Sequence, residues 1–284
     1  MKAHAFEYLR ARSLGEALAA LAARPGEARV LAGGQSLVPL MNMRLASPAA
    51  LVDVGAVPEL RGVEVRDGCL RLGALTRHHE LLDIPEIAEH APLLARAAPY
   101  VGHAAIRNRG TLGGSLAHAD PGAELPACVL ALGGRVLVAS TRRTRAIAAE
   151  QFFLGPYTTA LDPDEILLGV DLPIARADGR YSFHEFARRA GDFAMAGLAA
   201  VGRREAGTLC GVRLAFFGLG GTPLLAPRAA AAVEGRTPTP DVLAVVERAL
   251  GEDLSPQPDL HTSAAMKAHL VRVLAARTLA ELAS

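Results

Sequence analysis

Two glycine-rich stretches decide the fold of this chain: Ala32-Gly33-Gly34-Gln35-Ser36-Leu37 and Thr111-Leu112-Gly113-Gly114-Ser115. The first follows an apolar segment, 28–31, that predicts a strand, and a helix over 38–44 is expected to begin near Ser36. Glycine lets the backbone approach a ligand closely, and free amides at such a turn favour phosphate. Alone, this loop is weak evidence, because a strand-to-helix turn that merely needs glycine explains it at least as well.

The second loop favours a ligand. The stretch 106–115 contains three glycines and two arginines, and Thr111 and Ser115 add hydroxyl donors. Backbone amides in such a turn can form an anion-binding concavity. Asp120 and Glu124 follow, and carboxylates beside a phosphate site are suited to accept hydrogen bonds from ribose hydroxyls. Two diphosphate-type loops and a sugar-binding carboxylate together predict a dinucleotide site.

The common dinucleotide motifs are missing. No G-x-G-x-x-G follows the first strand, and the P-loop pattern G-x-x-x-x-G-K-[ST] is absent. Adjacent His78 and His79 would point in different directions on a helix, so we do not expect them to share a metal. Spacing supports no Ser-His-Asp or Cys-His arrangement either. The sequence therefore indicates a different dinucleotide fold, with no catalytic residue and no metal site assigned.

Composition narrows the class of protein further. The 284 residues are 51% hydrophobic, and 30 Lys+Arg oppose 29 Asp+Glu, which argues against nucleic-acid binding. Cys69, Cys128 and Cys210 are far apart, so a four-thiolate cluster cannot be built from them. Neither a secretory signal nor a run of about 20 apolar residues is visible. We expect a soluble, cytoplasmic protein with no membrane span.

Local patterns predict an α+β chain with a domain boundary near 173–179. Ser13 is expected to cap the first helix, and Thr76 a helix that begins at Arg77. Asp67-Gly68 predicts the turn of a hairpin. Strands are expected at 51–54, 62–65, 69–72, 135–139, 165–172, 181–186 and 210–219, and further helices at 92–101, 123–132, 228–233, 241–250 and 263–282.

Three blocks carry a family resemblance: 32–37, 106–115 and 117–127. Together they resemble the flavin-binding medium subunit of molybdenum hydroxylases, the carbon monoxide dehydrogenase and xanthine dehydrogenase family. The resemblance continues through 164–168 and 188–194, in the expected order, and covers nearly the whole chain.

The resemblance implies an α+β fold in two parts. Residues 1–175 would form a two-subdomain FAD-binding domain of the vanillyl-alcohol-oxidase (PCMH) type, with subdomains of about 1–55 and 56–175. Residues 176–284 would form a small α+β C-terminal domain like that of the carbon monoxide dehydrogenase flavoprotein.

The family also implies a set of FAD-binding residues. Residues 30–37 would wrap the pyrophosphate, the second loop would clamp it, and Glu124 would bond a sugar hydroxyl. The whole implied set is Val30, Leu31, Ala32, Gly33, Gly34, Gln35, Ser36, Leu37, Val101, Thr111, Gly113, Gly114, Ser115, Asp120, Glu124, Leu167, His184 and Phe193.

Three of these positions depart from the family pattern. Ser115 stands where many members have Asn, and His184 stands where some members have Lys. Phe193 stands where carbon monoxide dehydrogenases have a Tyr stacked beside the isoalloxazine ring, so it keeps the stacking surface without the hydroxyl.

The implied function is that of an FAD-carrying electron-transfer subunit of a multi-subunit molybdenum hydroxylase. Its implied partners are a molybdenum-cofactor large subunit and a [2Fe–2S] small subunit, assembled as a dimer of heterotrimers. One alternative is a self-sufficient FAD-dependent reductase that acts directly on a small molecule. A non-catalytic interaction protein is a third, and the intact glycine pairs and Glu124 argue against it.

Overall fold

The N-terminal part of the chain builds a small parallel sheet. The computed structural model describes residues 2–284, and its first sheet has the strand order β1-β3-β2 with both neighbouring pairs parallel. Its elements are β1 (Glu7–Arg10), α1 (Leu14–Ala22), β2 (Ala28–Leu31), α2 (Leu37–Asn42) and β3 (Ala50–Asp53). Ser13 caps α1 as predicted, because its Oγ accepts a hydrogen bond from the Glu16 amide at 3.2 Å. The sequence does not predict β1, whose four residues are all exposed.

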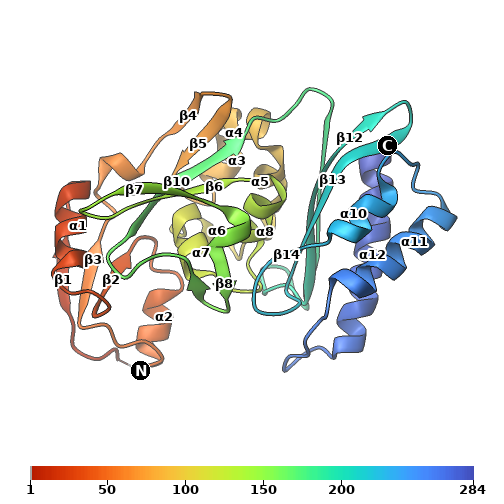
Figure 1. The fold of residues 1–284 in the computed structure, drawn as a ribbon. Coiled ribbons are helices and arrows are strands. Elements are labelled where there is room, and N and C mark those ends of the chain that lie inside the picture. Colours follow the sequence, from red (N-terminus) through yellow and green to blue (C-terminus); the bar gives the residue numbers. More distant parts are fainter. Residues whose placement is uncertain (1) are drawn as a thin grey trace.

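An antiparallel sheet forms the centre of the molecule (Figure 1). Its strands, in spatial order, are β4 (Val63–Arg66), β5 (Cys69–Gly73), β10 (Ile166–Pro173), β6 (Arg135–Ala139) and β7 (Thr144–Ala148). The predicted hairpin is confirmed, since Asp67 and Gly68 have φ of 50° and 73°, as a type I′ turn requires. The sequence does not predict β7, because only Ile147 of its five residues is buried.

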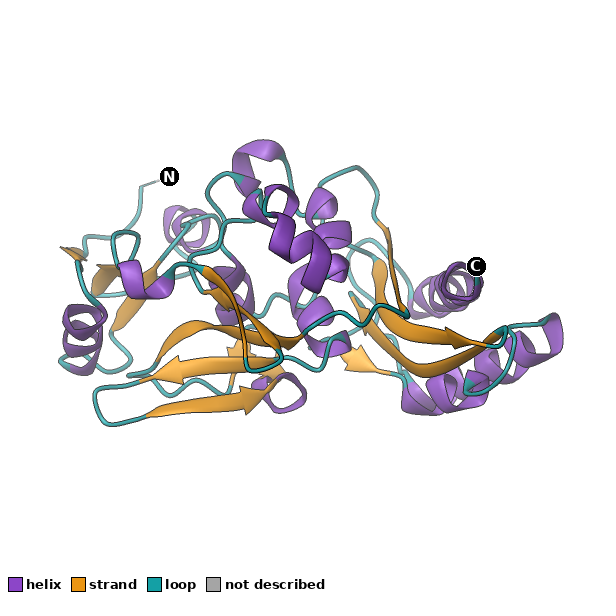
Figure 2. Cartoon of the chain, turned by 90° about the horizontal axis from the view of Figure 1, so that it is seen from above, coloured by secondary structure: helices purple, strands orange, loops and turns teal. Residues whose placement is uncertain are grey.

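Most of the helices of this region lie on one side of the central sheet (Figure 2). They are α3 (Glu80–Asp83), α4 (Pro85–His90), α5 (Pro92–Ala97), α6 (Ala104–Arg107), α7 (Leu112–His118) and α8 (Glu124–Ala131), with a 3-10 turn, η2, at Ala98–Tyr100. The expected helix starting at Arg77 is wrong, because α3 begins only at Glu80. The backbone before it is extended instead: Arg77 forms a bridge with Thr111, and the His78 amide donates to the Gly110 carbonyl at 3.1 Å.

A second antiparallel sheet begins after residue 178. It consists of β11 (Gly179–Phe186), β12 (Ala196–Glu205), β13 (Thr208–Phe217) and β14 (Leu224–Leu225), followed by α10 (Pro227–Val233), α11 (Pro240–Asp253) and α12 (Ala264–Ala283). These three helices match the predicted ones within a few residues. Smaller elements complete the chain: η1 (Pro58–Leu60), α9 (Ala149–Phe152), β8 (Phe153–Gly155) and β9 (Thr158–Thr159).

The C-terminal sheet is buried on both faces. Ala199, Ala215 and Phe217 point into the core that α5 and α8 share with the central sheet. The alternate residues Leu198 and Leu214 point into a second core, made with α10, α11 and α12. Figure 1 shows the sheet standing between these two groups of helices. Successive residues of these strands point to opposite faces, and both faces are apolar. The sheet therefore packs against both halves of the chain and holds them together.

Polar contacts fix the same junction. Arg213 of β13 donates to the carbonyl oxygens of Leu130 and Ala131 at 3.0 and 2.9 Å, so it satisfies carbonyls at the C-terminal end of α8. Glu281 of α12 accepts a hydrogen bond from Arg96 of α5 at 2.7 Å and another from Ser182 of β11 at 2.6 Å. Both clusters tie the C-terminal elements to helices of the preceding half.

The close packing of Gly197 against Phe217 gives a stability prediction. A Cβ at Gly197 would lie within 2.8 Å of the Phe217 ring, so Gly197→Ala should lower the free energy of unfolding by about 1–3 kcal/mol. The matched control is Gly251→Ala in α11, where no atom lies within 4 Å of the added carbon, and it should raise stability by about 0.5–1 kcal/mol. Urea unfolding measures both. A Gly197→Ala protein as stable as the wild type would contradict this packing.

Candidate functional site

The two glycine-rich loops meet through their backbones. A Cβ at Gly33 would lie 2.9 Å from the Gly110 Cα and closer still to the Arg109 carbonyl oxygen, so only glycine permits this approach. Gly110 is itself packed against the ring of buried His78, where a Cβ would lie 2.8 Å from Nδ1. Residues almost 80 positions apart in sequence thus form one continuous surface, as the dinucleotide hypothesis requires.

The first loop presents free backbone amides. Within residues 2–284, the amides of residues 33–36 have no protein acceptor, although the loop is only partly exposed. Gly34 has φ of 73°, and the Gln35 side chain donates to the Gly33 carbonyl at 3.0 Å, which stabilises the turn. Unpaired amides in a turn with positive φ form a concavity for an anion. This loop fits the phosphates of a dinucleotide.

The second loop works differently from the expectation. Its amides are already bonded within the protein: Leu112 donates to Thr76 O at 2.8 Å, Gly113 to Ala74 O at 2.9 Å, and Gly114 to Thr111 Oγ1 at 3.1 Å. The predicted amide concavity is therefore wrong here. Gly113 serves close packing instead, because a Cβ would lie 2.6 Å from the Ala74 Cβ. What remains for a ligand are the hydroxyl groups of Thr111 and half-buried Ser115.

Asp120 and Glu124 lie on the turn that links α7 to α8. Asp120 shapes the turn, since its Oδ1 accepts from the Gly122 amide at 2.9 Å and its Oδ2 from the Tyr157 hydroxyl at 3.3 Å. Glu124 begins α8 and is only 5% exposed, yet in residues 2–284 no other residue donates a hydrogen bond to it. Burial, and then the charge of Asp120, raises the pKa of Glu124 to about 7. A buried carboxyl that receives no hydrogen bond from another residue can accept one from the hydroxyl group of a ligand.

Val101 and Leu167 of the predicted set lie in the core. Val101, just after η2, is 8% exposed, and Leu167 on β10 is 6% exposed. Leu167 adjoins a register shift between β10 and β6. Both belong to the hydrophobic core that also contains the buried residues of α8.

The structure places His184 next to Glu281. Its Nε2 lies 2.9 Å from Glu281 Oε2, on the face of β11 that contacts α12. Glu185, the next residue, lies on the opposite face with Phe183, toward α8. Sequence reasoning missed Glu185, although strand alternation through buried Phe183 could have indicated it. Burial, and then the charge of Glu124, raises the pKa of Glu185 to about 8.

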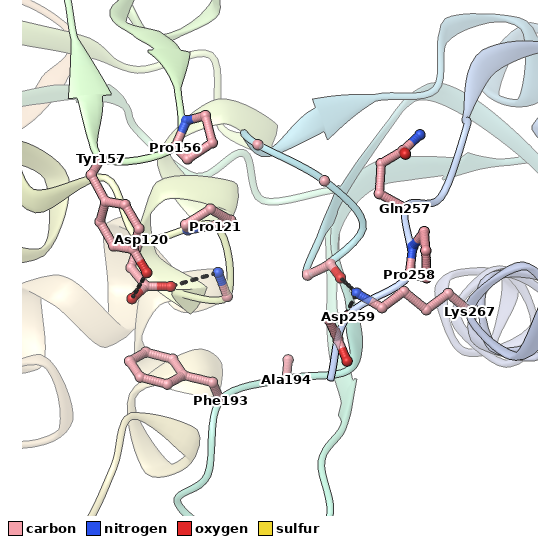
Figure 3. A pocket seen from close by; sticks show the side chains of 14 residues that line it. Asp120, Pro121, Pro156, Tyr157, Phe193, Ala194, Gln257, Pro258, Asp259 and Lys267 are labelled. Carbon is pink, nitrogen blue, oxygen red and sulfur yellow. Dashed lines mark hydrogen bonds and ion pairs between the residues drawn. The ribbon is translucent and has the colours of Figure 1, made fainter. Parts of the chain in front are cut away.

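Phe193 lies at the mouth of a cavity between the two halves. The Phe193 side chain is 65% exposed and lies beside Gly122. A Cβ added at Gly122 would lie 3.3 Å from the Cβ of Phe193. The cavity has a volume of about 400 Å³, and Asp120, Tyr157 and Lys267 also line it (Figure 3). Buried Lys267 donates to the Gly218 carbonyl at 2.6 Å and pairs with Asp259 at 2.7 Å, so its charge is satisfied. The sequence indicated Asp120 and Phe193 here, but not Tyr157 or Lys267.

Two further observations concern the chain as described. Across residues 2–284, no group of three or more His, Cys, Asp or Glu side chains is placed to hold a metal ion. In the same residues, none of the helices has both the length and the apolar character needed to cross a membrane.

Comparison with known proteins agrees with the geometry. Residues 4–175 match the family model described as the FAD binding domain in molybdopterin dehydrogenase, and residues 181–282 match the CO dehydrogenase flavoprotein C-terminal domain. The chain is 37% identical over 282 residues to the 6-hydroxypseudooxynicotine dehydrogenase complex subunit alpha of Paenarthrobacter nicotinovorans, covering 99% of this chain and 95% of that protein. It is 32% identical to the carbon monoxide dehydrogenase medium chain of Hydrogenophaga pseudoflava, covering 96% of each.

Solved structures agree as well. A chain of the carbon monoxide dehydrogenase of Hydrogenophaga pseudoflava superposes with a TM-score of 0.96 at 34% identity, covering 99% of this chain and 98% of that one. A chain of quinoline 2-oxidoreductase from Pseudomonas putida 86 gives 0.95 at 37% identity, covering 100% and 98%. The predicted α+β fold and the FAD cofactor are confirmed. This chain therefore belongs to the molybdenum hydroxylase family as an FAD-binding medium subunit, part of an oxidoreductase.

Proposed function

We propose that this chain is the electron-transfer subunit of a multi-subunit molybdenum hydroxylase. It would take electrons from [2Fe–2S] clusters of a small partner subunit and pass them to an external acceptor, while a large subunit with the molybdenum cofactor acts on the organic substrate. The names of several relatives support this, since they are medium chains or FAD-binding subunits of dehydrogenases. Assembly as a dimer of heterotrimers and a cytoplasmic location belong to the same proposal.

The chain's own part is to hold and orient FAD, which supplies one- and two-electron redox chemistry when bound. The free amides of residues 33–36 would bind the pyrophosphate, and the hydroxyls of Thr111 and Ser115 would add donors beside them. Glu124 would bond a sugar hydroxyl. Val101 and Leu167 would exclude water from the ring, and Phe193 would offer it a stacking surface. His184 Nε2 lies 2.9 Å from Glu281 Oε2, on the face of β11 that contacts α12, so we assign it no contact with FAD in this proposal.

We propose the domain division that the sequence predicts. Residues 1–175 would form the FAD-binding domain, with subdomains near 1–55 and 56–175, and residues 176–284 the C-terminal domain. Support comes from the gap between β10, which ends at Pro173, and β11, which starts at Gly179. The parallel sheet and the central antiparallel sheet correspond to the two proposed subdomains.

One observation carries the proposal: among residues 2–284 the amides of residues 33–36 have no acceptor, and this loop lies against a second loop that is followed in the chain by the buried carboxyl of Glu124. Such a surface is suited to bind the phosphates and sugar hydroxyls of a cofactor. The alternative, a self-sufficient reductase, needs a substrate pocket at the flavin. The cavity beside Phe193 is a candidate for that pocket, so an experiment must separate the two functions.

Reconstitution distinguishes the relay from the reductase. The full chain, purified with its partner subunits, should show flavin absorption bands, and the flavin should be bleached anaerobically when the substrate of the complex is added. The isolated chain loaded with FAD should not be bleached by that substrate. If the isolated chain is reduced by an organic substrate as fast as the complex, the electron-relay proposal is wrong.

Gly33→Ala tests the contact between the loops. The added methyl group meets the Arg109–Gly110 backbone, and a clash of about 1–3 kcal/mol corresponds to FAD affinity at least about fivefold weaker. Fluorescence titration of the apoprotein with FAD measures this. Gly15→Ala in α1 is the control, because its Cβ would have only Ser13 Oγ nearby, at 3.9 Å, and its FAD affinity should equal that of the wild type. Unchanged affinity in Gly33→Ala would remove the first loop from the cofactor site.

A further inference from the structure

The cavity beside Phe193 lies between the two halves of the chain. Figure 3 shows the rings of Tyr157 and Phe193 on one wall and Lys267 of α12 on the opposite wall. A backbone hydrogen bond joins the two walls, because the Gly218 amide donates to the Pro121 carbonyl at 2.9 Å. The cavity volume of about 400 Å³ falls in the range of about 300–1,000 Å³ that small-molecule sites occupy. The cavity is therefore large enough for a small ligand.

Two large aromatic side chains are exposed on the first wall. Tyr157 is 60% exposed and Phe193 is 65% exposed. Tyr157 has φ of 53°, a left-handed conformation that a bulky residue rarely adopts. Its amide donates to the Ala119 carbonyl at 3.0 Å and its hydroxyl to Asp120 Oδ2 at 3.3 Å, so the ring is held beside the cavity despite the backbone strain. Strained residues cluster at functional sites, and two exposed rings offer surfaces on which a planar molecule can pack.

Lys267 brings a hydrogen-bond donor to the opposite wall. Its side chain is only 5% exposed, and its Nζ lies 2.6 Å from the Gly218 carbonyl oxygen and 2.7 Å from Asp259 Oδ2. Asp259 Oδ1 accepts from the amides of His261 and Thr262 at 2.7 and 2.8 Å, which keeps the carboxylate in place. An ammonium group has three N–H donors, and residues 2–284 supply acceptors for two of them. The third N–H is available to an oxygen atom of a ligand in the cavity.

The charges around the cavity disfavour an anionic ligand. Its lining contains two carboxylates, those of Asp120 and Asp259, and one ammonium group, that of Lys267. Pro156 and Pro258 add apolar surface. A phosphate or carboxylate in the cavity would meet a net negative charge, and like charges repel. A neutral, planar molecule with an oxygen acceptor fits this lining better.

We propose that the cavity binds a quinone, a neutral planar ring with two carbonyl oxygens, as the external acceptor that reoxidises the flavin. The quinone packs against the aromatic rings of Tyr157 and Phe193, and one of its carbonyl oxygens accepts a hydrogen bond from Lys267. Phe193 belongs both to this cavity and to the proposed flavin site, which makes the cavity a suitable place for the acceptor.

The redox step balances without any further reactant. The quinone takes up the two electrons and two protons that the reduced flavin gives up, and it becomes the hydroquinone. This inference rests on the proposed electron-transfer function. It deepens that function by naming the class of the acceptor and two binding residues, Tyr157 and Lys267.

Binding of duroquinone to the FAD-loaded full chain, measured by equilibrium dialysis, tests the site. Duroquinone is the probe because its ring is fully substituted and cannot add to a free thiol such as Cys69 or Cys210. Tyr157→Asn removes the aromatic ring, and Asn tolerates the left-handed conformation, so the dissociation constant should rise about tenfold. Equal affinity of Tyr157→Asn and the wild type, or binding that does not saturate, overturns the proposal.

Two control variants isolate the aromatic ring. Tyr157→Phe keeps the ring and loses only a hydroxyl that already bonds to Asp120, so its dissociation constant should stay within about threefold of the wild-type value. Leu154→Asn is the matched control on the same hairpin, because Leu154 on β8 is 63% exposed but does not line the cavity. It should bind duroquinone as the wild type does. A loss of affinity in Leu154→Asn equal to that in Tyr157→Asn contradicts a role of the Tyr157 ring.

Two further probes test the wild type, so their results do not depend on whether a variant folds. Durene has the same methylated ring without the carbonyl oxygens, and it should bind at least about tenfold more weakly, because it cannot accept a hydrogen bond from Lys267. NAD⁺ carries a negatively charged diphosphate and should not displace duroquinone. Durene binding as tight as that of duroquinone, or displacement by NAD⁺, contradicts the proposal.

Reoxidation kinetics separate this inference from the function on which it rests. A stoichiometric amount of dithionite reduces the flavin of the FAD-loaded chain without any partner subunit. Duroquinone should then reoxidise it at a rate that saturates, and Tyr157→Asn should raise the half-saturating concentration about tenfold. A flavin that duroquinone does not reoxidise contradicts the quinone site alone, whereas the electron-transfer function is tested separately by bleaching of the flavin in the complex.

Discussion

The backbone of Gly33 lies directly against the Arg109–Gly110 peptide, and the site depends on that contact. It joins a parallel subdomain to the helices above the central sheet without any side chain between them. Next to this contact, the amides of residues 33–36 have no acceptor among residues 2–284. Because these amides donate to no protein group, they are free to donate hydrogen bonds to an anion.

The second loop has a structural task and does not present a second set of free amides. Its amides bond to residues 74–76, so the stretch from Ala74 to Arg77 is drawn into extended contact with Thr111. Two glycine pairs that look alike in sequence therefore have different tasks. Gly33 and Gly34 open the backbone to a ligand, whereas Gly113 allows a helix to pack tightly on Ala74.

The C-terminal sheet packs against α8, the helix that begins with Glu124. Apolar residues alternate on both of its faces, and Arg213 anchors it to the end of α8. The same α8 carries Glu124 at its other end, so the junction between the halves also determines the environment of that carboxyl. Burial is the main reason why the pKa of Glu124 on α8 and the pKa of Glu185 on β11 are both raised.

Local signals in the sequence were enough for much of this protein. The capping of α1 by Ser13, the type I′ turn at Asp67-Gly68 and the strand at Ala28–Leu31 depend on neighbours a few residues away, and all three are as predicted. The order of the motifs was also enough to identify the family and its cofactor, because the glycine loops and the carboxylates can be recognised from the sequence without the structure.

Tertiary structure alone decided the rest. Whether a backbone amide has a hydrogen-bond acceptor depends on residues far away in the sequence. The sequence therefore could not show that the amides of the second loop are bonded and those of the first loop are not. The sequence placed His184 in the site, but the pleat of β11 turns it toward Glu281 and turns Glu185 toward α8. β1 and β7 carry mostly exposed residues, so only pairing with neighbouring strands defines them. Burial and pairing across distant segments set these features, and no local pattern encodes them.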